Sequence, residues 1–189
     1  MKFKFYAFKL IGIIALVYLL QLFIHGFTDL FLLNSNSWTE IWRFVTSIFL
    51  HGSIAHLFYN GFALLLFGSI LERLIGGKKF LIVFFVSGVL ANLISVNFYS
   101  SSLGASGAIF GVIGALIVVR PLLIVWAFGL PMPMFVAGIV WAVGDVIGLF
   151  IPSGIANIAH LFGMAFGLIM GLLFRKKKIR TIKSRISID

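Results

Sequence analysis

The sequence predicts an all-α polytopic membrane protein, a bundle of six transmembrane helices with both termini in the cytoplasm. Of its 189 residues, 61% are hydrophobic and only 11% are charged, and the mean hydropathy is +1.16. Soluble domains carry about 25% charged residues, so this composition excludes an ordinary soluble globular protein. At about 20 residues per crossing, the chain has room for six helices in a single domain. We place that domain at residues 1–174 and a basic cytoplasmic tail at residues 175–189.

The charge and cysteine content narrow the possible partners. The chain has no cysteine, which excludes disulfides, thiolate nucleophiles and cysteine-ligated metals. Its net charge is +10, but the lysines and arginines lie at the ends of apolar runs. A nucleic-acid partner would favour a basic stripe on a soluble element, so we expect the lipid bilayer and no nucleic acid. We expect neither a cofactor nor a metal.

The first expected helix, Leu10–Phe27, follows a short basic leader. No small-residue cleavage site follows the apolar run, so we expect a retained helix rather than a removed signal peptide. The stretch Thr28–Thr46 is polar and carries Trp38 and Trp42, which favour the membrane interface. We expect this stretch to lie on the bilayer surface.

Further apolar runs predict five more helices. Their expected ranges are Ile54–Leu71, Phe80–Phe98, Ser106–Val119, Met134–Ile151 and Ile155–Phe174. The fourth of the six helices ends at Arg120 and Pro121, because proline continues a helix poorly. Leu122–Leu130 lies between prolines and is too short to span a bilayer, so we expect an interfacial or re-entrant segment.

Six spans place every basic residue except Arg43 on one side of the membrane. The positive-inside rule makes that side the cytoplasm, with both termini in it. The second, fourth and sixth helices then all begin at the external face. Their amino-terminal ends therefore share one depth.

Polar residues gather at these three helix starts. His51, His56 and Asn60 open the second helix, Ser106 opens the fourth, and His160 lies in the first turns of the sixth. Polar groups within hydrocarbon are costly and are by default functional or paired, so this set suggests a hydrated cavity. A serine hydroxyl becomes a nucleophile when a neighbouring base takes its proton, and His160 is the candidate base for Ser106.

Glycine stripes on two helices favour close backbone packing. The stripes are Gly107, Gly111 and Gly114 on the fourth helix and Gly163, Gly167 and Gly171 on the sixth. His160 lies on the same face as Gly163, so this packing would bring its imidazole to Ser106. The oxygen of the carbonyl that Ser106 attacks becomes negative in the transition state and needs hydrogen-bond donors. His56 and Asn60, which share a helical face, could supply two, and the backbone N–H of Ser106 could supply a third.

These motifs resemble the rhomboid family of intramembrane serine proteases, in the form of a minimal six-helix prokaryotic member. The first-loop and second-helix signature is carried by Trp42-Arg43, Thr46, His51-Gly52, His56, Asn60, Gly68, Glu72 and Gly76. Gly104-Ala105-Ser106-Gly107 matches the Gly-x-Ser-Gly motif, and Ala159-His160 with Gly163 and Gly167 matches the sixth-helix motif. Together the matches cover roughly residues 42–171.

The resemblance implies a catalytic dyad of Ser106 and His160, with no aspartate as a third member. It also implies an oxyanion hole formed by His56, Asn60 and the backbone at Ser106, with a supporting role for His51. Other residues around this site are Gly104, Gly107, Phe110 and Gly163. Phe110 stands where family members often have a tyrosine that stacks on the catalytic histidine, and phenylalanine can still stack.

The resemblance further implies that the substrates are transmembrane segments of other membrane proteins, which enter laterally past the fifth helix. In this chain the gate would involve the segment from Phe150 to Gly154. A multi-pass location in the plasma membrane of a prokaryote is implied as well.

Other functions remain open from the residues. His51, His56, His160 and Asp145 could ligate a metal or relay protons in a small ion carrier, and an inactive relative could bind transmembrane helices without cleaving them. The lack of a His-Glu-x-x-His motif argues against a metalloprotease. Asp145 could act on a histidine, line a water path or meet solvent, and we assign it no catalytic role. From the sequence alone, we expect an ion carrier to tolerate Ser106→Ala and depend on Asp145, and a protease to show the reverse; a contact between Asp145 and the catalytic histidine would remove the second half of this distinction.

Overall fold

The computed structural model describes residues 4–151 and 154–175, and all statements below concern those residues. The chain is mostly helical, with two small two-stranded sheets. The α-helices are α1 (Tyr6–Phe23), α2 (Phe27–Phe31), α3 (Arg43–Thr46), α4 (Ile54–Ala63), α5 (Ser69–Ile75), α6 (Gly77–Ser95), α7 (Ser106–Val119), α8 (Met134–Gly148) and α9 (Asn157–Phe174). The strands are β1 (Leu33–Asn34), β2 (Ser101–Ser102), β3 (Ile124–Ala127) and β4 (Leu130–Pro133). Two 3-10 turns, η1 (Ser35–Trp38) and η2 (Ser47–Phe49), and a π-helical turn, η3 (Leu64–Gly68), complete the order.

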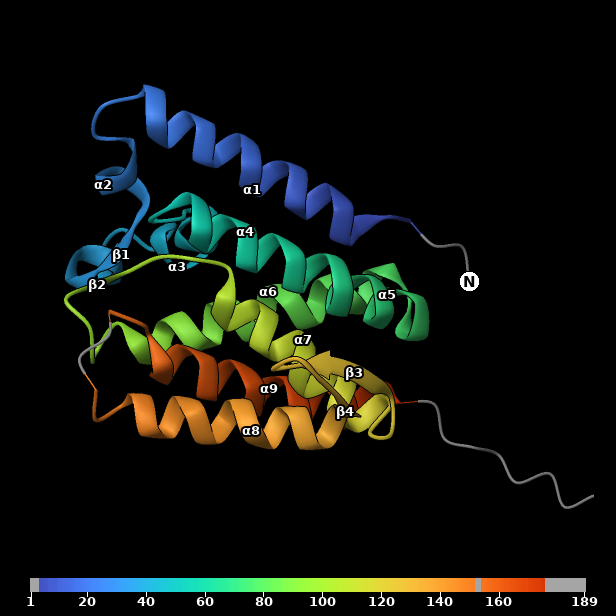
Figure 1. Ribbon diagram of the computed structural model, residues 1–189. Coiled ribbons are helices and arrows are strands. Elements are labelled where there is room, and N and C mark those ends of the chain that lie inside the picture. The colour runs from blue at the N-terminus through green and yellow to red at the C-terminus, as the bar shows by residue number, and fades with distance from the viewer. Residues whose placement is uncertain (1–3, 152–153, 176–189) are drawn as a thin grey trace, which may run out of the picture.

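Helix α7 lies at the centre of the bundle, against α6, α8 and α9 (Figure 1). Every residue from Gly107 to Leu116 is buried except Phe110, which is partly exposed. In Figure 1 the start of α1, the end of α9 and the strands β3 and β4 lie at the same end of the bundle, and β1 and β2 lie at the opposite end. The glycines of α7 allow its neighbours to approach closely, which explains why this short helix is covered on so many sides.

Four helical segments of the described chain are long and apolar enough to cross a membrane. They are α1, the continuous rod Ile54–Ile75 formed by α4, η3 and α5, α6, and α9. Helices α7 and α8 are apolar but shorter. Large apolar side chains such as Leu16, Phe58, Ile139 and Leu173 are exposed along the outside of the bundle. Such a surface suits lipid rather than water, and the chain is a multi-pass membrane protein.

The structure corrects the end of the first helix and shows a hairpin that the sequence did not predict. The first helix ends at Phe23 and not at Phe27, because the chain turns at Gly26, whose φ is +77°, into the separate helix α2. Leu122–Leu130, for which we expect an interfacial or re-entrant placement, enters the antiparallel hairpin β3–β4, a conformation that the sequence did not predict. Phe128 and Gly129 both have positive φ at its two-residue turn, as right-handed strand twist favours. The fold is therefore not purely α-helical.

The other predicted boundaries differ by a few residues. Ser106–Val119 matches α7, whereas the fifth helix ends at Gly148 rather than Ile151, and the sixth begins at Asn157 rather than Ile155. Of the expected gate, Pro152 and Ser153 lie outside the described residues, as does the basic tail beyond residue 175.

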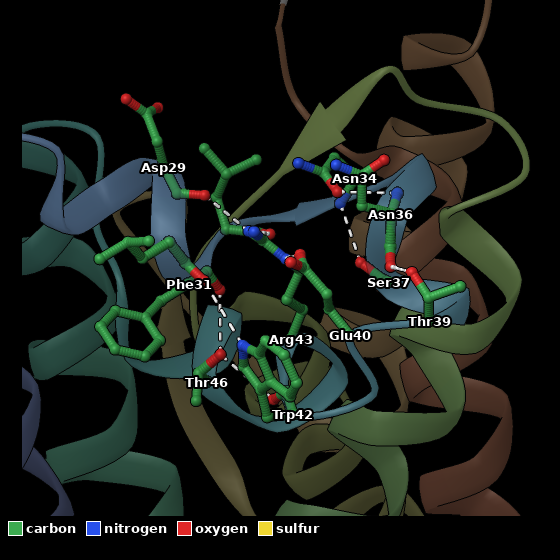
Figure 2. Close-up of polar contacts among 12 residues, drawn as sticks. Asp29, Phe31, Asn34, Asn36, Ser37, Thr39, Glu40, Trp42, Arg43 and Thr46 are labelled. Carbon is green, nitrogen blue, oxygen red and sulfur yellow. Dashed lines mark hydrogen bonds and ion pairs between the residues drawn. The ribbon is translucent and has the colours of Figure 1, made fainter.

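The loop before α4 folds around a buried arginine, Arg43, as Figure 2 shows. The Arg43 guanidinium pairs with the Glu40 carboxylate and donates from Nη1 to the carbonyl oxygens of Asp29 at 2.6 Å and Leu32 at 2.9 Å. Thr46 Oγ1 donates to the Phe31 carbonyl at 3.0 Å. A charged side chain that satisfies several backbone acceptors can remain buried, so Arg43 holds the loop in one conformation.

A buried glutamate fixes the opposite end of the bundle. Glu72 is 1% exposed, and its carboxylate accepts hydrogen bonds from the backbone N–H groups of Lys4 and Ala7, each at 3.1 Å. Because the first N–H groups of a helix have no partner within it, this contact stabilises the start of α1. The rod Ile54–Ile75 is thereby tied to α1.

Candidate active site

The seam between α7 and α9 sets the positions of the two predicted reacting side chains. A Cβ built on Gly163 would overlap the carbonyl of Gly107, and one built on Gly167 would overlap the carbonyl of Gly111. The two backbones are therefore in direct contact, as the glycine stripes predict. This packing fixes the first turns of α9 against the start of α7.

Ser106 is the first residue of α7, and the preceding loop is tied down. The Gly104 N–H donates to the Ser47 carbonyl at 2.9 Å, and Gly104 has φ +127°, a conformation that favours glycine. The N–H groups in the first turn of a helix have no acceptor within it and carry a partial positive charge. The backbone N–H of Ser106 is therefore available as a hydrogen-bond donor at the open end of the helix.

His160 contacts Ser106 directly. Its Nε2 lies 2.8 Å from Ser106 Oγ, a hydrogen-bond distance. The Phe110 ring stacks on the imidazole with centroids 4.3 Å apart and planes 7° from parallel, which fixes the ring plane. Tyr99 Oη accepts a hydrogen bond from the Ile158 N–H at 3.1 Å and so anchors the start of α9.

Asp145 contacts His160, which is one of the three environments that the sequence left open for this residue. Its Oδ1 lies 2.9 Å from His160 Nδ1, and the residue is only 7% exposed. The resemblance implied no aspartate beside the histidine, and solvent exposure was one of the expected environments. The structure instead buries this carboxylate against the imidazole. The spacing of α8 residues gave no signal for this, because it depends on how α8 is rotated against α9.

His56 and Asn60 lie on α4 facing the same region. Ser53 caps α4, since its Oγ accepts a hydrogen bond from the His56 N–H at 3.1 Å. Asn60 Nδ2 donates to the His56 carbonyl at 3.1 Å, which leaves its second N–H available. A Cβ built on Gly104 would lie 2.7 Å from His56 Cε1, so the α7 loop and the His56 ring are tightly packed.

His51 lies behind His56 and does not line the cavity. It is 1% exposed, and its ring meets that of His56 edge-on with centroids 4.9 Å apart. Gln21 of α1 accepts from the His51 N–H at 2.9 Å and donates to its carbonyl at 3.2 Å. Burial, with the nearby His56 acting in the same direction, lowers the pKa of His51 to about 4. This neutral side chain is placed to support the His56 ring.

A cavity of about 1310 Å³ collects these groups. Its lining includes His56, Asn60, Ser106, Phe110 and His160, with apolar walls from α4 and α8. All the polar residues predicted for nucleophile, base and oxyanion donors therefore face one space. Within the described residues, no three His, Cys, Asp or Glu side chains are grouped as metal ligands would be.

Comparisons with known proteins agree on one family. A family model described as the Rhomboid domain matches residues 38–177. YdcA of Bacillus subtilis (strain 168) is 35% identical over 147 residues, which are 75% of this chain and 71% of that protein. Rhomboid protease GluP of the same organism is 45% identical over 82 residues, 42% of this chain and 16% of GluP. Rhomboid protease GlpG of Yersinia pseudotuberculosis serotype I (strain IP32953) is 27% identical over 154 residues, 79% of this chain and 54% of GlpG.

This chain thus spans about half of GlpG and a small part of GluP. The residues that the family model matches, 38–177, include the three helix starts. A serine and a histidine in hydrogen-bond contact within an apolar bundle suit proteolysis in a membrane. The chain belongs to the rhomboid family of intramembrane serine proteases.

Proposed function

We propose that this chain is an endopeptidase that cleaves transmembrane segments of other membrane proteins, with Ser106 as nucleophile and His160 as general base. The observation that carries this proposal is the 2.8 Å contact between Ser106 Oγ and His160 Nε2 on the wall of the cavity. General-base activation needs this contact, because the serine hydroxyl is a weak nucleophile while it keeps its proton.

The reaction has two stages. His160 Nε2 takes the Ser106 proton as Oγ attacks the scissile carbonyl, and the imidazolium then gives this proton to the leaving amine as the peptide bond breaks. Water next attacks the Ser106 ester, loses a proton to His160, and releases the carboxyl product as Oγ regains a proton. The same side chain acts as base and then as acid in each stage.

The oxyanion of each tetrahedral intermediate needs donors already in place. We assign this role to the backbone N–H of Ser106, the side-chain N–H of Asn60 and the ring of His56. These groups come from two helices whose positions are fixed by the Ser53 cap and by the contact between Gly104 and His56. Preorganised donors of this kind supply a large share of catalysis because they need no rearrangement during the reaction.

The proposed topology has six spans, both termini in the cytoplasm and the cavity open to the external side. The start of α1 and the end of α9 lie at one end of the bundle (Figure 1), which fits termini on a shared side. Residues 1–174 then form the membrane domain and residues 175–189 a basic tail that meets anionic lipid. We place the protein in the plasma membrane of a prokaryote. Because the chain has no cysteine, single cysteines at Asp29 or Phe128 and an impermeant thiol reagent test the orientation.

The test of the activity is cleavage of a transmembrane peptide by the purified protein in liposomes. We expect cleavage by the wild type and none by Ser106→Ala or His160→Ala, with thermal unfolding unchanged. Undiminished cleavage by Ser106→Ala contradicts the assignment. If the wild type binds the transmembrane peptide without cleaving it, an inactive helix-binding protein is favoured. Ion flux that persists in Ser106→Ala would favour an ion carrier.

A further inference from the structure

Asp145 is a buried carboxylate whose side chain has one described partner, His160. Its Oδ1 lies 2.9 Å from His160 Nδ1, and Oδ2 has no hydrogen-bond partner in the part of the chain that the structure describes. Burying a carboxylate is costly unless it is paired and hydrogen-bonded. Its carboxylate has no other hydrogen-bond partner among the described residues, so the contact with the imidazole is what offsets its burial.

The two contacts of His160 use opposite nitrogens of one ring. Nδ1 faces the Asp145 carboxylate, and Nε2 faces the Ser106 hydroxyl at 2.8 Å. An ionised carboxylate only accepts hydrogen bonds, so it holds the ring proton on Nδ1. Nε2 is then left with its lone pair toward the serine, which is the tautomer that a general base requires.

Three helices contribute to this arrangement, Ser106 from α7, His160 from α9 and Asp145 from α8. The parallel stack of Phe110 fixes the ring plane but cannot distinguish one ring nitrogen from the other. Selection of the tautomer therefore needs a polar group at Nδ1. Asp145 supplies that group.

We propose that Asp145 is a positioning residue that selects the Nδ1-protonated tautomer of His160 and stabilises the imidazolium formed during catalysis. The inference rests on the proposed function of Ser106 and His160. No proton passes to the carboxylate, and the proton taken from Ser106 stays on Nε2 until it passes to the leaving amine.

Asp145→Asn is the variant that tests this role, because asparagine keeps the shape and offers an N–H to Nδ1. The ring then takes the other tautomer, whose Nε2 carries the proton and cannot accept one from the serine. We expect kcat for a transmembrane peptide to fall by about 10²- to 10⁴-fold, with KM within about twofold of wild type. The rate at which a fluorophosphonate labels Ser106 should fall in parallel, since that reaction also needs the base.

The matched control is Asp29→Asn, the same chemical change at an exposed residue whose carboxylate points away from the Arg43 contacts (Figure 2). We expect wild-type kcat for this variant. An Asp145→Asn protein with wild-type kcat and labelling overturns the proposal. A fall in thermal stability and a rise in KM with unchanged labelling also overturn it, because they indicate a structural role alone.

A measurement on the wild type does not depend on whether the variant folds. Nitrogen-15 NMR of histidine-labelled protein, with the His160 signals assigned by their loss in His160→Ala, reports which ring nitrogen is protonated. We expect the proton on Nδ1 at neutral pH, and a proton on Nε2 overturns the inference. Absence of cleavage by the wild type, with this tautomer present, would instead overturn the proposed function and the catalytic role of Asp145 with it.

Discussion

Replacing Gly104 with alanine should disable the proposed oxyanion hole without touching a reacting atom. The residue has φ +127° and lies just before α7, where its N–H donates to the Ser47 carbonyl. An added Cβ would meet His56 Cε1 at 2.7 Å and Nε2 at 2.8 Å. The methyl group therefore strikes the ring of a proposed donor.

The size of the effect follows from these distances. Ordinary van der Waals contact begins near 3.4 Å, so the His56 ring must retreat by about 0.7 Å. The strained backbone adds a cost of about 1–3 kcal/mol to folding. Loss of one oxyanion donor typically lowers kcat by about 10²- to 10³-fold, and we expect a fall in kcat of about 10²-fold for Gly104→Ala.

The assay compares kcat in liposomes and thermal unfolding in detergent for Gly104→Ala and Gly26→Ala. Gly26 also has positive φ, +77°, but a Cβ there would meet no heavy atom within 4 Å. We expect Gly26→Ala to lose stability and to keep its kcat. Wild-type kcat in Gly104→Ala, or an equal loss in both variants, refutes the argument that the contact with His56 is responsible.

Two further predictions follow from the packing and from a buried histidine. Gly163→Ala should force α9 away from Gly107 and abolish cleavage, at a cost of about 1–3 kcal/mol in unfolding free energy. Gly12→Ala, whose Cβ meets open space, should preserve both cleavage and stability. Equal behaviour of the two variants would contradict this prediction. The pKa of His51, outside the spans, is lowered from 6.5 to about 4, so its neutral form contributes stability above pH 6.5 that is lost as the pH falls toward 4. Between pH 7 and pH 4, the unfolding free energy of His51→Gln should fall by about 3 kcal/mol less than that of the wild type. An equal fall in the two proteins would contradict this prediction.

The sequence identified the pairing of Ser106 with His160 because that pairing depends on a local signal. Glycines at helical spacing predict which faces of two helices meet, and those faces also carry the serine and the histidine. The bounds of α7 were equally predictable, because a polar loop that contains three serines and Gly104 precedes it and Arg120-Pro121 follows it. The catalytic roles of these residues stay predictions.

Features that depend on tertiary packing were either missed or left open among alternatives. The contact between Asp145 and His160 requires a particular rotation of α8 about its axis. The glycines of α8 do not predict this rotation, since a Cβ at Gly144 would meet no heavy atom within 4 Å. The hairpin turn requires a positive φ at Phe128, which a phenylalanine rarely adopts and no propensity would suggest. Burial of Arg43 depends on carbonyl groups many residues away.

The π-helical turn at Leu64–Gly68 divides the rod Ile54–Ile75 into two parts with separate angular registers. The first part presents His56 and Asn60 to the cavity, and the second presents Glu72 to the start of α1. Each residue of an α-helix turns the chain by about 100°. Removing one residue from this turn would rotate one set of side chains by that angle against the other. One helix could then no longer serve both ends of the bundle.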